Sequence, residues 1–147
     1  MNAIATLRET ASQPPPSRRT LRSVGAVLGG LLSTVVVTTA VDIVLHTLHV
    51  FPPMNERMAD ALFVVALAYR IPFNVGGSYV AARLAPARPM FHALALGALG
   101  VVVATLGAIA MWDHGPAWYS LGNIVIAMPC AWLGGRLSIR RRAALKA

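Results

Sequence analysis

Charged residues are scarce in this sequence of 147 residues: they make up 12% of it, and only five are acidic. A soluble globular domain usually carries about 25% charged residues. Apolar residues, by contrast, make up 56% of the chain, and the mean hydropathy is +0.63. This composition excludes an ordinary soluble domain and indicates a membrane protein, with the lipid bilayer as its first partner.

Cysteine occurs once, at Cys130, which excludes an internal disulfide and a metal site built from cysteines. Catalytic signatures are lacking as well. The chain has no GxSxG motif, no P-loop and no glycine-rich dinucleotide fingerprint, and no serine has a histidine and an acid placed for a triad. We therefore expect that the protein is not an enzyme.

Four apolar stretches are long enough to cross about 30 Å of hydrocarbon as helices. They cover residues of about 24–50, 58–84, 90–112 and 117–137. Short connections make consecutive helices antiparallel neighbours. The predicted fold class is all-α: an integral membrane bundle of four antiparallel transmembrane helices within residues 21–142. A disordered tail that is rich in polar residues and proline, residues 1–20, precedes it, and a basic tail end, residues 143–147, follows it.

The distribution of Lys and Arg predicts the orientation, because cytoplasmic loops are enriched in both. Arg57 lies on one side of the predicted bundle and Arg70 lies within a span, whereas the other eleven of the 13 basic residues lie on the opposite side. Both termini are therefore predicted to be cytoplasmic. Since these residues flank apolar segments, the net charge of +8 does not indicate a nucleic-acid partner. The eleven are Arg8, Arg18, Arg19, Arg22, Arg83, Arg88, Arg136, Arg140, Arg141, Arg142 and Lys146.

The end of the second stretch and the start of the third have a characteristic pattern of small residues. Residues 76–84 read GGSYVAARL, and residues 89–93 read PMFHA. This pattern resembles small uncharacterised four-span inner-membrane proteins of bacteria. The resemblance implies a multi-pass protein of the bacterial plasma membrane and no particular activity.

Two charges lie inside the predicted spans, Asp42 in the first and Arg70 in the second. Charges are expensive in hydrocarbon, so each indicates a partner or a functional role. Side chains on a helix point toward its N-terminus, so on antiparallel helices these two lean toward each other in depth. We predict an ion pair between them in the outer half of the membrane. Thr38 and Asn74 share their helix faces, Asn123 lies at a similar depth, and the five residues form a predicted intramembrane polar cluster.

Three functions remain open at this point. The first is a structural or accessory membrane protein, in which the ion pair fixes helix register and a second copy or another membrane protein is the partner. The second is a small proton- or ion-coupled transporter or channel that uses Asp42 and Arg70. The third is a metal- or pH-responsive protein, because Asp42, His46 and His49 lie on one face of the first span and suit a divalent ion such as zinc. No other cofactor is expected.

Overall fold

The computed structural model describes residues 16–53, 56 and 58–145. In chain order its elements are α2 (Pro16–Thr47), α3 (Asp60–Leu84), α4 (Pro89–Ala110), the short 3-10 helix η1 (Trp112–His114) and α5 (Ala117–Ala144). No strand occurs within the described ranges, which confirms the all-α fold class.

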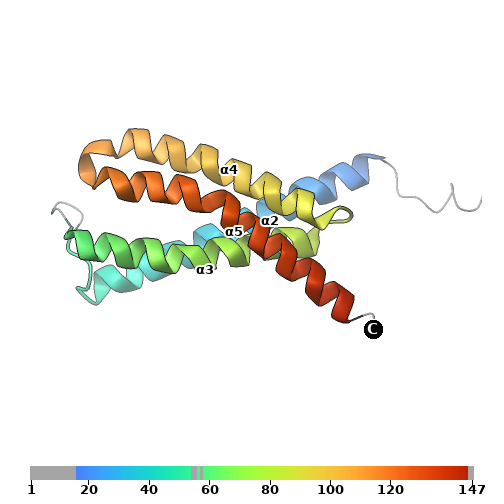
Figure 1. Cartoon of the computed structure of the whole chain (residues 1–147), viewed down its shortest axis with the longest axis horizontal. Helices are drawn as coiled ribbons and strands as arrows, with labels where there is room; N and C mark the ends of the chain where they lie inside the picture. Colours follow the sequence, from blue (N-terminus) through green and yellow to red (C-terminus); the bar gives the residue numbers. More distant parts are fainter. Residues whose placement is uncertain (1–15, 54–55, 57, 146–147) are drawn as a thin grey trace, which may run out of the picture.

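The four long helices run back and forth along one axis (Figure 1). The α2–α3 connection and η1 lie at one end of the molecule, on the left of Figure 1. The α3–α4 connection lies at the other end, together with the start of α2 and the end of α5. Helix α5 packs against both α3 and α4, and α2 packs mainly against α3. The order of packed neighbours is therefore α2, α3, α5 and α4.

The first long helix, α2, begins and ends earlier in the chain than the predicted span of residues 24–50. It begins at Pro16, whose fixed φ and missing N–H suit the first turn of a helix, so residues 16–20 are helical rather than part of a tail. It ends at Thr47 rather than near residue 50, because His49 adopts a left-handed backbone (φ 55) shortly before Pro52. The predicted tail residues 1–15, and residues 146–147, lie outside the described residues.

The last helix extends well beyond the predicted fourth span and ends at Ala144. Arg142 holds this extension against the end of α3, where its Nη2 donates to the carbonyl oxygens of Ala82 (3.0 Å) and Arg83 (2.5 Å). The last carbonyls of a helix have no partner inside that helix, so this arginine supplies one. The basic end of α5 is therefore part of the helix assembly.

Small residues fill the interfaces between helices, and large apolar residues face outward. Ala81, Ala93 and Ala131 are fully buried, whereas Ile109 is 71% exposed and Val125 is 68% exposed. A soluble protein buries such large residues in its core. Close contact between small residues is instead how helices associate in lipid, where the solvent is as apolar as leucine.

Three helices in the described part of the chain are long and apolar enough to cross a membrane: α2 from Arg18 to Thr47, α3 and α4. This finding supports a membrane protein. Helix α5 is not among the three; it contains Asn123, Pro129 and Arg136 and ends in basic residues. The fourth crossing, and with it the four-span bundle, stays a prediction.

Glycines mark the closest helix crossings. A Cβ atom added at Gly30 of α2 would lie 2.6 Å from the carbonyl oxygen of Gly77 on α3. A Cβ atom added at Gly134 of α5 would lie 2.8 Å from both the Ser78 Cβ and the Tyr79 backbone nitrogen on α3. Real Cβ atoms do not make contacts this short, so these crossings leave no room for a side chain.

Candidate functional site

A cavity of about 600 Å³ lies among the four long helices. Its lining comes mainly from the C-terminal halves of α2 and α4 and the N-terminal halves of α3 and α5. These halves lie at the same end of the molecule, on the left of Figure 1. All five residues of the predicted polar cluster line this cavity: Thr38, Asp42, Arg70, Asn74 and Asn123.

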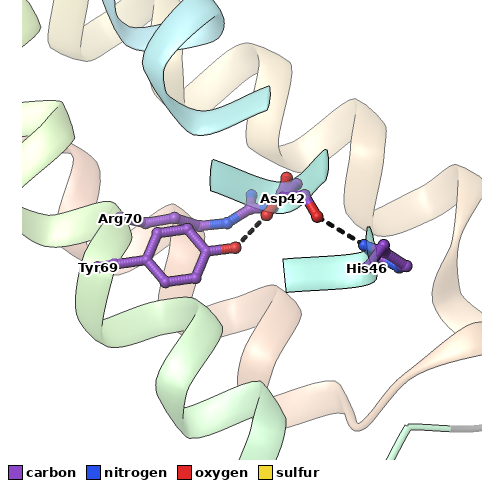
Figure 2. A network of polar contacts seen from close by, with 4 residues as sticks. All are labelled: Asp42, His46, Tyr69 and Arg70. Atoms are coloured by element: carbon purple, nitrogen blue, oxygen red, sulfur yellow. Dashed lines mark hydrogen bonds and ion pairs between the residues drawn. The ribbon is translucent and has the colours of Figure 1, made fainter. Parts of the chain in front are cut away.

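Asp42 and Arg70 form an ion pair inside this cavity. Arg70 Nη2 lies 3.5 Å from Asp42 Oδ2, which confirms the predicted pairing of the two side chains. The other carboxylate oxygen, Oδ1, accepts a hydrogen bond from the Tyr69 hydroxyl. Figure 2 shows Tyr69 and Arg70 reaching from α3 to the same carboxylate on α2. Each oxygen of Asp42 therefore has a partner on α3.

Arg70 has more donors than these contacts use. A guanidinium group carries five N–H donors. Its Cζ lies 5.8 Å from the centre of the Tyr119 ring, within cation–π range, and its Nε is buried and donates to no group among the residues described. The Arg70 and Asp42 side chains are 32% and 31% exposed. The pair therefore faces the cavity rather than being sealed between two helices.

Tyr69 and Tyr119 are not among the site residues that the sequence predicts. Adjacent residues on a helix point about 100° apart, so Tyr69 does not share the helix face of Arg70. Two long side chains overcome this angle and converge on Asp42. A tyrosine next to an intramembrane charge is the signal that identifies such a residue, because a buried hydroxyl needs a hydrogen-bond partner.

The proposed metal ligands do not come together. His46 is half-buried, its Nδ1 donates to the backbone carbonyl oxygen of Asp42 at 2.8 Å, and its ring lies edge-to-face with Phe51 at 5.5 Å. His49 follows the end of α2 and is exposed, so it no longer shares a helical face with the other two. Within the described residues, no three His, Cys, Asp or Glu side chains are grouped as ligands for a metal ion. The zinc hypothesis stays a prediction.

The cavity widens where α2 and α4 separate. Near the other end of the molecule these helices approach each other, since a Cβ atom at Gly30 would lie 2.8 Å from Leu96 Cδ2. Farther along, Val35 on α2 and Val103 on α4 both line the cavity and are 50% and 53% exposed. Residues that both line a cavity and meet the surroundings form its rim. The cavity is therefore open sideways between α2 and α4.

Comparison with known protein families, curated proteins and solved structures finds no match to this chain. The geometry of the cavity is therefore the observation that bears on function.

Proposed function

We propose that this chain is a small multi-pass membrane protein that binds a ligand in the cavity between its four helices. The Asp42–Arg70 pair carries the proposal: about one third of each side chain is exposed, and both line a cavity of about 600 Å³. Small-molecule pockets measure about 300–1,000 Å³. Each side chain therefore keeps surface that a ligand in the cavity can contact.

The class that we propose for this role is a small proton- or ion-coupled transporter. Intramembrane charges commonly mark substrate and ion pathways. Asp42 is the group that can exchange a proton or a cation, and Arg70 is the group that can hold an anionic part of a ligand. Tyr69 supports the carboxylate through its hydroxyl. Thr38, Asn74 and Asn123 line the same cavity and supply neutral polar contacts.

A structural or accessory role is the second candidate, and one observation favours it. The ion pair joins α2 to α3, and these helices also meet closely at Gly30 and Gly77. A pair at such a contact can fix the register of two helices without binding anything. A second copy of the chain or another membrane protein would then be the partner.

The topology that goes with the proposal has four spans and both termini in the cytoplasm of a bacterial cell. The excess of basic residues at one end of the helices supports it. Reporter fusions after Leu48 and Pro116 are expected to be active outside the plasma membrane. Fusions after Pro86 and at the C-terminus are expected to be active inside. An external C-terminus would contradict this topology.

Access of water to the cavity tests the ligand-binding proposal. The sequence contains one cysteine, Cys130, so a Cys130→Ala background leaves no native thiol. In it, Ser120→Cys places a thiol in the cavity lining, and Val125→Cys places one on the outward face of the same helix. A charged, membrane-impermeant maleimide added outside whole cells is expected to label residue 120 at least about tenfold faster, because a thiol reacts in water and not in lipid. Equal or slower labelling of residue 120 would favour the structural role.

A further inference from the structure

The sideways opening of the cavity limits what can enter it. On α2 the rim includes Val35 and Thr39, on α4 it includes Val103 and Gly107, and Met111 follows directly after α4; all five are exposed. If α2 and α4 cross the membrane, this sideways opening faces the acyl chains of the bilayer, and water enters from the end of the helices where Met111 and Gly115 line the cavity. A ligand that enters here must carry an apolar part.

The cavity changes in polarity along its length. Asp42 lies five residues before the end of α2 at Thr47, which places it about 7.5 Å below the helix end. The lining continues to Leu31, about 16 Å farther along the helix. At that inner end Thr34 donates its hydroxyl to the Gly30 carbonyl of its own helix at 3.1 Å and so offers no free donor. The part of the cavity at Asp42 and Arg70 therefore suits a polar group, and the innermost part, beyond Thr38 and Asn74, suits a hydrocarbon chain.

The charges at the polar end favour a group that carries both signs. Asp42 and Arg70 neutralise each other, so a ligand with a net charge would bring an uncompensated charge into a cavity with apolar walls. The Arg70 guanidinium has five N–H donors on a side chain that is 32% exposed, so it can donate to an anionic oxygen in the cavity. The Asp42 carboxylate has one donor on each oxygen and retains lone pairs for an ammonium group.

We propose that the cavity binds a zwitterionic amphiphile, which enters from the bilayer between α2 and α4. Its phosphate or carboxylate lies at Arg70, its ammonium group lies at Asp42, and one acyl chain extends toward Leu31. This inference rests on the proposed ligand-binding function and names its ligand class. Two sources offer the same head-group chemistry, a membrane lipid and a soluble zwitterion, and the acyl chain distinguishes them.

The test uses the full chain in micelles of dodecyl maltoside, whose head group carries no charge, and a lysophosphatidylethanolamine probe with a photoreactive acyl chain. Unlabelled lysophosphatidylethanolamine is expected to compete for the saturable labelling. Lysophosphatidylglycerol has the same acyl chain and a head group with a net negative charge. It is expected to require at least about a tenfold higher concentration to lower the labelling to the same extent. Phosphoethanolamine, the head group alone, is expected not to compete. Labelled peptides should come from residues 31–38 and 100–107, which line the part of the cavity that the acyl chain occupies.

A matched pair of glycine variants locates the site. A Cβ atom at Gly107 or at Gly76 has nothing within 4 Å, so neither position lies against a neighbouring helix. Gly107 lines the cavity, whereas Gly76 lies on an exposed face of α3 outside its lining. Gly107→Phe is expected to lower saturable labelling at least about fivefold, and Gly76→Phe is expected to leave it unchanged. Equal labelling of the two variants would place the binding site elsewhere and overturn the proposal.

A double variant tests whether the Asp42–Arg70 pair selects the zwitterionic head group. The double change Asp42→Asn with Arg70→Gln removes both charges, and it is expected to make the two lysolipids compete within about twofold of each other. A tenfold preference that persists in this variant would show that the pair does not select the head group. Effective competition by phosphoethanolamine would identify a soluble ligand, which refutes the amphiphile and leaves the proposed function standing. Absence of saturable labelling also refutes the amphiphile; the labelling of Ser120→Cys then decides separately whether the cavity is open to water.

Discussion

Replacing Gly134 by leucine is expected to destabilise the protein by about 3 kcal/mol. The added Cβ would lie 2.8 Å from both the Ser78 Cβ and the Tyr79 backbone nitrogen. Backbone atoms cannot turn aside as a flexible side chain can, so α3 and α5 must separate. The contact between these two helices also supports the cavity, since both contribute to its lining. Ligand binding should therefore be lost together with stability.

Thermal unfolding in a mild detergent measures the effect, with Gly76→Leu as the matched control. Gly76 is also a glycine in a helix that contacts α5, but a Cβ there has nothing within 4 Å. The control should unfold within a few degrees of the parent, and Gly134→Leu should unfold far lower or fail to accumulate. If both variants unfolded at the same temperature, the close α3–α5 crossing would be wrong.

Removing one member of the Asp42–Arg70 pair is expected to cost about 2–3 kcal/mol. Breaking a fully buried pair costs about 3–5 kcal/mol, because the remaining charge has no partner. We expect the smaller cost of about 2–3 kcal/mol because about one third of each side chain is exposed, so the remaining charge is only partly buried. Asp42→Asn leaves the Arg70 guanidinium without its counter-ion. Arg70→Gln leaves the Asp42 carboxylate with the Tyr69 hydroxyl as its remaining partner in Figure 2.

The double variant Asp42→Asn with Arg70→Gln is expected to recover at least half of the summed loss, because it leaves no uncompensated charge. Unfolding midpoints of the parent, the two single variants and the double variant give the coupling energy. Tyr69→Phe extends the comparison: it should cost about 1.5–3 kcal/mol in the parent, where the hydroxyl bonds a charged oxygen. In the Asp42→Asn background it should cost less. Strictly additive losses for Asp42 and Arg70 would mean that the two side chains are not energetically coupled.

The pairing of Asp42 with Arg70 could be predicted because it depends on properties of single helices. Helix direction follows from the order of apolar stretches, side-chain tilt follows from helix geometry, and the cost of a charge in hydrocarbon requires a partner. The same local properties predicted the all-α fold class and the polar cluster of five residues. The predicted end of the first helix was wrong by a few residues. His49 has a left-handed backbone conformation, which the periodicity of apolar residues does not reveal. That error placed His49 on a helical face that it does not share.

The composition and periodicity of the sequence determined that the chain is helical, apolar and provided with charges that need partners. Only the tertiary structure decided which glycines meet another helix: Gly134 and Gly30 lie at crossings and Gly76 does not, although all three are glycines within helices. It also decided that Tyr69 completes the site and that α2 and α4 separate around a cavity. The reason is physical. A helix face is fixed by the positions of residues along one segment, whereas a crossing or a cavity depends on the distance between two segments, which the packing of all four helices sets together.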